Sequence, residues 1–101
     1  MQIIQATTLK QRLDNGETIH LIDVRQPEEH AEFNIGGLLL PLGNIMAMQT
    51  EEIEDWKEEE VICYCRSGAR SMQAAMMLES MGFKNVHNLA GGMMGWQATF
   101  G

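Results

Sequence analysis

The sequence predicts an α/β domain with a central, mainly parallel sheet of five strands and helices on both of its faces. Segments typical of strands alternate along the chain with segments of helical periodicity, which is the order found in parallel sheets. The segments 19–24 and 60–64 are apolar enough to be strands that are buried on both faces. With 101 residues, the chain is expected to form one domain, 1–101, with a hydrophobic core of its own.

Short apolar runs mark the five expected strands. Ile3 and Ile4 predict a short edge strand, and Leu38–Leu40 predict a strand that Pro41 ends. The run 60–64 is expected to be a central strand because it is strongly apolar. The two remaining strands are expected at 19–24 and 86–89.

Helix start and stop signals lie between these strands. Thr7 or Thr8 is expected to cap the first helix and Gly16 to end it, whereas Pro27 suits the first turn of the second helix. Gly82 is expected to end a strongly periodic helix that follows the fourth strand. The predicted helices lie at 7–15, at 27–33, once or twice within 44–57, at 71–81, and around Met93 and Trp96 after the Gly91-Gly92 turn.

Four of the nine methionines lie on the periodic helix. Met72 and Met76, like Met77 and Met81, are four residues apart, which places each pair on one helix face. Methionine fills irregular gaps in a core well. We therefore expect these side chains to pack in the core rather than to bind a metal or a partner.

The formal net charge of −7 disfavours nucleic acid and anionic membranes as partners. Carboxylates are concentrated between residues 51 and 60, where Lys57 is the single cation, and this run is interpreted as a solvated helix face and loop. No segment approaches the roughly 18–20 apolar residues that a membrane span needs.

The N-terminal residues and the cysteines bear on the compartment. Residues 1–5 lack the basic region and the long apolar run of a secretory signal. Cys63 and Cys65 are one residue apart, so they cannot staple a fold, and their spacing does not match a metal site. We expect a cytoplasmic, monomeric protein in a reducing compartment, without a metal or a cofactor.

The segment from Cys65 to Arg70 carries the candidate chemistry. It leaves the carboxyl end of an apolar strand and enters a helix, the edge at which ligands bind in open α/β sheets. Gly68 lets the short backbone curl so that several N–H groups face inward, which makes an anion site at a helix N-terminus. Those donors, with Arg66 and Arg70, would favour the thiolate of Cys65. The sequence therefore predicts a nucleophilic cysteine that needs no histidine base.

Five short motifs, in order along the chain, resemble those of the rhodanese-homology family of sulfurtransferases. The segment Cys65–Ser71 resembles the active loop of that family, and the resemblance extends over residues 3–97. The other motifs are Asp23-Val24-Arg25 with Pro27-Glu28-Glu29, Asn34-Ile35-Gly36-Gly37 with Pro41-Leu42, Gly82-Phe83-Lys84-Asn85-Val86, and Gly91-Gly92 with Trp96.

The resemblance implies a rhodanese-like three-layer fold and a thiosulfate sulfurtransferase-like enzyme. Cys65 would take a sulfane sulfur from a donor such as thiosulfate or polysulfide as a persulfide, and cyanide or a thiol would then accept it. The expected partners are small sulfur-containing anions and thiols, including a thioredoxin- or glutathione-type acceptor. The residues implied to form the cradle for sulfur and substrate are Arg66, Ser67, Gly68, Ala69 and Arg70.

Three residues before the loop are interpreted as structural support. Arg25 and Glu29 are four residues apart across the start of a helix, so a salt bridge between them is expected. Asp23 is expected to be a hydrogen-bonding scaffold residue rather than a catalyst.

The chain departs from the family pattern at two positions. Asn34 stands where the family often has histidine, and His30 where it often has an aromatic residue. His30 is expected at the surface or in packing, and the two remaining histidines, His20 and His87, are expected to be structural.

Two alternative functions remain open. Related phosphatases and arsenate reductases resemble rhodaneses but have five residues between cysteine and arginine, whereas four separate Cys65 from Arg70. The smaller ring suits one sulfur atom better than a tetrahedral oxyanion, so this alternative is the weaker one. The other is a persulfide carrier or adaptor that hands sulfur to a partner protein. Cys63 is expected to be buried in packing, with a resolving role in oxidation as the lesser alternative.

Overall fold

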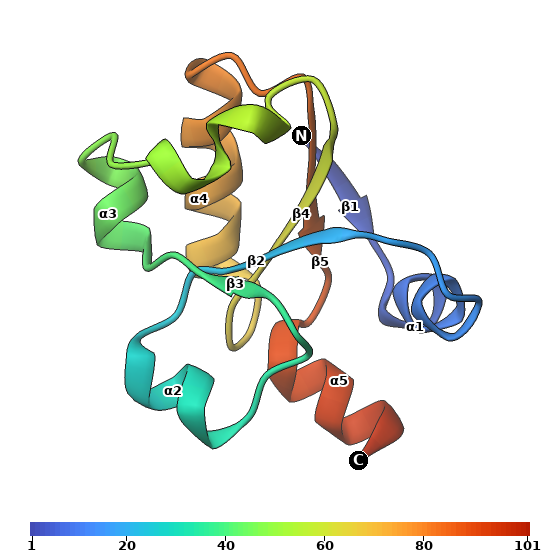
Figure 1. Ribbon diagram of the computed structural model, residues 1–101. Helices are drawn as coiled ribbons and strands as arrows, with labels where there is room; N and C mark the ends of the chain where they lie inside the picture. Colours follow the sequence, from blue (N-terminus) through green and yellow to red (C-terminus); the bar gives the residue numbers. More distant parts are fainter.

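The computed structural model describes residues 1–101 and contains one sheet of five strands (Figure 1). The strand order is β1-β5-β4-β2-β3, and all four neighbouring pairs are parallel, so the predicted fold class is confirmed. The elements are β1 (Gln2–Ile4), α1 (Ala6–Asp14), β2 (His20–Asp23), α2 (Pro27–Glu32), β3 (Leu38–Leu39), α3 (Leu42–Met46), the 3₁₀ helix η1 (Glu51–Trp56), β4 (Glu60–Tyr64), α4 (Ala69–Ser80), β5 (Asn85–Leu89) and α5 (Gly92–Phe100).

The central strand β4 separates two hydrophobic clusters. Val61 and Cys63 face the first cluster, which α3, η1 and α4 cover, whereas Ile62 and Tyr64 face the second, which α1 and α5 cover (Figure 1). This alternation follows from the period of two along a strand. All four side chains have no solvent exposure, as expected of a strand with a helical layer on each face.

Two helix starts differ from the predictions. The first helix begins at Ala6 with Gln5 in the extended N-cap position, and neither Thr7 nor Thr8 caps it, because the chain turns directly out of β1. The helix expected after residue 44 begins at Leu42, immediately after Pro41. Pro27 begins α2 as predicted, since its fixed φ suits a first helical turn.

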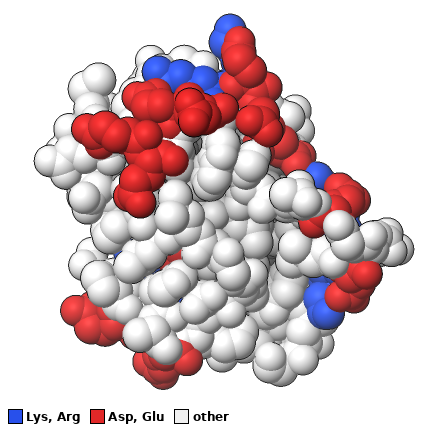
Figure 2. Space-filling model, in the orientation of Figure 1, with Lys and Arg blue, Asp and Glu red and all other residues white.

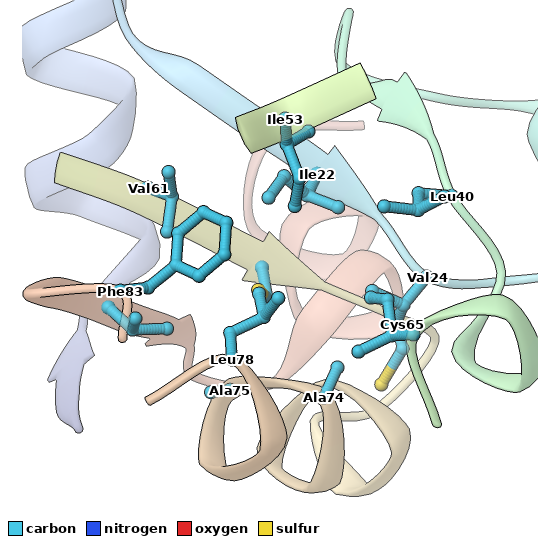
Figure 3. Packing of buried hydrophobic residues seen from close by; sticks show 13 residues of the cluster. Ile22, Val24, Leu40, Ile53, Val61, Cys65, Ala74, Ala75, Leu78 and Phe83 are labelled. Atoms are coloured by element: carbon cyan, nitrogen blue, oxygen red, sulfur yellow. The ribbon is translucent and has the colours of Figure 1, made fainter. Parts of the chain in front are cut away.

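Of the two methionine pairs predicted to pack in the core from α4, one is exposed and the prediction for it is wrong. Met72 and Met76 are 43% and 59% exposed, although their spacing suggested a core stripe. The face that meets the sheet is made of smaller side chains, including the fully buried Ala75 and Leu78, which allow α4 to lie close to the strands (Figure 3). Met77 and Met81, the other expected pair, are partly buried and pack against the first cluster.

The acidic run lies on the surface, as predicted. Glu51, Glu52, Glu54 and Asp55 are exposed on η1. Ile53 of that helix is buried in the core, and Trp56 packs against it. Figure 2 shows acidic side chains gathered at the end of the molecule that carries η1. None of the helices combines the length and the apolar character that crossing a membrane would require.

The two faces of α4 give a stability prediction. Leu78→Ala should lower the free energy of unfolding by about 2–5 kcal/mol, because it removes a fully buried side chain and leaves a cavity. Met76→Ala, on the exposed face of the same helix, should change it by no more than about 0.5 kcal/mol. Urea denaturation followed by circular dichroism measures both, and equal losses would contradict the observed orientation of α4.

Candidate active site

Cys65 lies directly after β4, where the chain turns into α4. Gly68, the N-cap residue of α4, has a φ of 110°, a left-handed conformation that disfavours residues with a side chain. This turn directs the N–H of Gly68 at Cys65 Sγ, with a donor–acceptor distance of 3.0 Å. The N–H of Ser71 points at the same sulfur at 3.4 Å, and Ser71 Oγ lies 3.3 Å from it. The sulfur is therefore placed where a helix N-terminus and its amides favour negative charge.

The pKa of the Cys65 thiol is lowered by this arrangement. Burial acts in the opposite direction and is the largest single influence, because it disfavours the charged thiolate. The hydroxyl of Ser71 and the amides of Ser71, Gly68 and Ser67 together outweigh it. Cys63, also buried but without such donors, has its pKa raised to about 12 by burial and by the neighbouring Cys65. The hydrogen bonds to Cys65 Sγ therefore explain why the pKa values of the two cysteines shift in opposite directions.

The thiol of Cys65 is covered as well as hydrogen-bonded. The residue is 1% exposed and contributes to the first hydrophobic cluster. Figure 3 shows its sulfur at the edge of this cluster, next to α4. A buried and inert cysteine would lack the amide donors that converge on this sulfur, so its burial does not by itself make Cys65 a packing residue.

The first turn of α5 fixes the back of the loop. The N–H groups of Met93 and Met94 donate to the carbonyl oxygens of Cys65 and Arg66 at 2.8 and 2.9 Å. Any Cβ at Gly92 would lie 2.5 Å from Cys65 O and 2.6 Å from Arg66 O, so only glycine allows this close approach. Because α5 binds the carbonyls on one side, the loop can turn its amides to the other side, toward the sulfur.

Two functional candidates were missed in the sequence. Ser71 follows the predicted cradle of residues 66–70, of which Gly68 donates a hydrogen bond to Cys65 Sγ and the amide of Ser67 also lowers the pKa of the thiol. Asn88, a 2% exposed residue of β5, accepts a hydrogen bond from Ser71 Oγ and donates one to Gly68 O at 3.2 Å. No signal in the sequence singled out Asn88, because β5 also contains the polar residues Asn85 and His87.

The support residues pair differently from the expected pattern. Arg25 does not pair with Glu29: its guanidinium donates twice to the carboxylate of Asp23, at 2.9 and 2.8 Å. Asp23 and Arg25 are 0% and 5% exposed, and His30 Nδ1 also bonds to Asp23 at 2.8 Å. The expectation of an Arg25–Glu29 salt bridge is therefore wrong, because Asp23 lies two residues away and already presents a buried carboxylate.

Glu29 instead binds Arg70 of the active loop region. Two hydrogen bonds of 2.8 Å join the carboxylate of Glu29 to the guanidinium of Arg70. The pKa of Glu29 is lowered to about 2, mainly by this contact. The pair ties α2 to the start of α4, and it occupies the guanidinium that was expected to bind substrate.

Arg66 is the free cation of the site. Its exposed side chain forms no ion pair, and it lines a cavity of about 520 Å³ beside the loop. Apolar atoms of Phe33, Met93 and Met94 and polar groups of Glu32 and Gln97 line other parts of the cavity. Cys65 itself is not part of the wall, so the cavity is an approach to the loop and does not reach the sulfur.

Asn34 organises the chain between α2 and β3. Its amide donates to His30 O at 2.9 Å, and its Oδ1 accepts from Gly36 N–H at 2.8 Å. Asn34 thus supports the turn that leads to β3, and neither of these hydrogen bonds involves the loop after β4.

Comparisons with known proteins agree with this geometry. The family model of the rhodanese-like domain matches residues 5–99. A sulfurtransferase of Allochromatium vinosum is 40% identical over 94 residues, which cover 92% of this chain and 85% of that protein. The putative sulfur carrier protein YrkF of Bacillus subtilis is 35% identical over 92% of this chain and 49% of its own length. The human single-domain sulfurtransferase TSTD1 superposes with a TM-score of 0.83 at 26% identity, covering 100% of this chain and 99% of that one.

A five-stranded parallel sheet with an amide-bound cysteine after its central strand defines an α/β protein of the rhodanese type. The chain belongs to the rhodanese-like domain family, and two of the three similar proteins described above are named sulfurtransferases. The resemblance found in the sequence motifs is therefore confirmed.

The Glu29–Arg70 pair predicts a pH-dependent contribution to stability. Because the pKa of Glu29 falls from 4.5 to about 2 on folding, the stabilisation is fully present above about pH 4.5 and is lost as the pH falls toward 2. Glu29→Gln should lower the free energy of unfolding at pH 7 by roughly 1 kcal/mol, since the pair is partly exposed. Urea unfolding at a series of pH values should show this difference shrinking in that window.

The matched control for this measurement is Glu28→Gln. It removes the same charge one residue away, from a carboxylate that has no ion-pair partner, and should unfold like the wild type at pH 7. A difference between Glu29→Gln and wild type that stayed constant from pH 7 to pH 2 would contradict the proposed role of the ion pair.

Proposed function

We propose that the protein transfers sulfane sulfur from a donor such as thiosulfate or polysulfide to cyanide or a thiol, through a persulfide on Cys65. The observation that carries the proposal is the convergence of Gly68 N–H, Ser71 N–H and Ser71 Oγ on Cys65 Sγ. These donors favour a thiolate at neutral pH and would equally stabilise the terminal sulfur of a persulfide.

In the first step, the Cys65 thiolate attacks the outer sulfur of thiosulfate. A new S–S bond forms to Cys65, the S–S bond of thiosulfate breaks, and sulfite leaves with the electron pair of that bond. We expect Arg66, which has no ion-pair partner and lines the neighbouring cavity, to bind the oxygens of the sulfonate end. Arg70 contributes mainly by holding the loop, because Glu29 already binds its guanidinium.

In the second step, a nucleophilic acceptor takes the sulfur. Cyanide or a thiolate attacks the terminal sulfur of the Cys65 persulfide, and the Cys65 thiolate leaves with the electron pair of the broken S–S bond. The loop amides receive the returning negative charge on Cys65 and so close the cycle. Small thiols and a thioredoxin- or glutathione-type acceptor are the partners that this chemistry would accept.

The proposal is tested with thiosulfate and cyanide. Thiocyanate should form with the wild type, and intact mass after thiosulfate alone should show one added sulfur atom. Cys65→Ser should abolish both while the circular dichroism spectrum stays native. The matched control Cys63→Ala should retain both, because Cys63 is a buried packing residue with a raised pKa. Full activity of Cys65→Ser would refute the assignment of the nucleophile.

The role of Arg66 is tested by the choice of donor. Arg66→Ala should raise the KM for thiosulfate by about tenfold, the worth of a charge-assisted hydrogen bond, and should affect inorganic polysulfide, which has no sulfonate group, much less. The control Lys84→Ala removes an equal charge from an exposed side chain elsewhere and should leave both donors unaffected. Equal losses for the two donors with Arg66→Ala would exclude binding of a sulfonate group by Arg66.

A persulfide carrier that serves a partner protein is the second candidate. Two observations favour it: Cys65 is almost fully covered, and the chain matches half of a protein named as a putative sulfur carrier. Persulfide on Cys65 without turnover of cyanide or small thiols would select the carrier over the enzyme.

A further inference from the structure

The polar side chain of Asn88 lies on the same sheet face as the reactive cysteine. In the parallel register of β4 and β5, Asn88 is paired with Cys63, two residues before Cys65. Val86, two residues before Asn88, belongs to the first hydrophobic cluster, so the period of a strand directs Asn88 toward α4 as well. An amide that is 2% exposed on an otherwise apolar face requires partners for its donor and its acceptor.

Both partners of Asn88 are groups that also serve the sulfur. Asn88 Oδ1 accepts the hydrogen bond of Ser71 Oγ, and Asn88 Nδ2 donates to Gly68 O at 3.2 Å. Gly68 and Ser71 are the two residues whose amides bond to Cys65 Sγ. One side chain of β5 thereby fixes the two ends of the turn that surrounds the sulfur.

We propose that Asn88 is a positioning residue that acts through Ser71 and Gly68 to hold the hydrogen-bond donors on Cys65 Sγ. The inference deepens the proposed sulfur transfer, since it names how the same site keeps its nucleophile charged. Asn88 does not touch the sulfur, and its effect is carried by the geometry of the turn. The left-handed Gly68 is the point at which this geometry is most easily lost, because an unrestrained glycine has many other conformations.

The hydroxyl hydrogen of Ser71 can be donated to more than one acceptor. It has one hydrogen, and three acceptors lie within reach: Asn88 Oδ1, Gly68 O at 3.2 Å and Cys65 Sγ at 3.3 Å. If Asn88 were only a competitor for this hydrogen, its removal would free the hydroxyl to bond to the thiolate. If Asn88 positions the turn, its removal would weaken several donors at once. The two roles predict opposite changes in thiolate formation.

Several titratable or charged groups surround Cys65, whereas Asn88, the residue of β5 at the site, is neutral. Six titratable or charged groups lie near the thiol. Glu29 of α2 is connected to the site through its ion pair with Arg70 of α4. The others are Cys63 of β4, Arg66 of the loop, Asp23 at the end of β2 and Arg25 after it. His87 of β5 bonds to Asn85 and Glu60 instead, and α5 contains no titratable side chain. None of these groups needs to change when Asn88 is replaced by a neutral residue.

The test measures thiolate formation directly. In a Cys63→Ala background, which leaves Cys65 as the only thiol, the rate of alkylation by iodoacetamide is followed against pH. Asn88→Leu keeps a side chain of similar size without hydrogen bonds and should move the midpoint to higher pH, with about a tenfold lower rate at pH 7. The rate at the alkaline plateau should change by less than about twofold, because the thiolate itself remains reactive.

Ser71→Ala is the second variant and removes a single oxygen atom from α4. It should move the midpoint in the same direction, so the proposal can be tested even if Asn88→Leu does not fold. The double variant should show less than the product of the two single effects, because Asn88 acts partly through Ser71. The matched controls, Asn85→Leu on the same strand and Ser80→Ala on the same helix, are exposed and should leave the midpoint unchanged.

Two results would overturn the proposal. An unchanged midpoint in both variants, with only a loss of stability in urea, would make Asn88 a structural residue without influence on the thiol. A midpoint at lower pH in Asn88→Leu would make it a competitor for the Ser71 hydrogen. Alkylation does not require sulfur transfer, so a wild type that forms no persulfide would refute the proposed function and leave this result standing.

Discussion

The candidate site depends on a few backbone amides that oppose the effect of burial on the Cys65 thiol and lower its pKa. Burial alone would raise the pKa of the Cys65 thiol, as it does for Cys63 within β4. The left-handed Gly68 and the first turn of α4 reverse that outcome by directing N–H groups at Sγ. Such donors are effective because they are fixed before the reaction and lie in surroundings that exclude water.

The order of the strands explains why so many elements meet at this sulfur. β4 is central, so its carboxyl end is flanked by the corresponding ends of β2 and β5. The segment after β2 leads into α2 and brings Glu29 to Arg70, while β5 brings Asn88 to the turn and leads into α5, whose amides bind the loop carbonyls. A parallel sheet places these contributions at one edge, although they are distant in sequence.

The charges near Cys65 are arranged differently from those on the rest of the surface. The acidic side chains gather around η1, at the end of the molecule shown at the top of Figure 2. At the loop, the carboxylates of Asp23 and Glu29 are bound to Arg25 and Arg70, which leaves Arg66 and Glu32 as the unpaired charges of the neighbouring cavity. The net charge of −7 therefore does not describe the charge around Cys65.

The sequence by itself determined the alternation of strands and helices, the central position of 60–64, and Cys65 with its glycine-containing loop, because local propensity and contiguous motifs carry that information. Only the tertiary structure decided that Glu29 pairs with Arg70 rather than Arg25, that Asn88 and α5 hold the loop, and that Met72 and Met76 face solvent. These features depend on which elements become neighbours in the sheet and on how closely α4 approaches it. Spacing along one chain segment cannot specify such contacts, since each joins residues from separate elements.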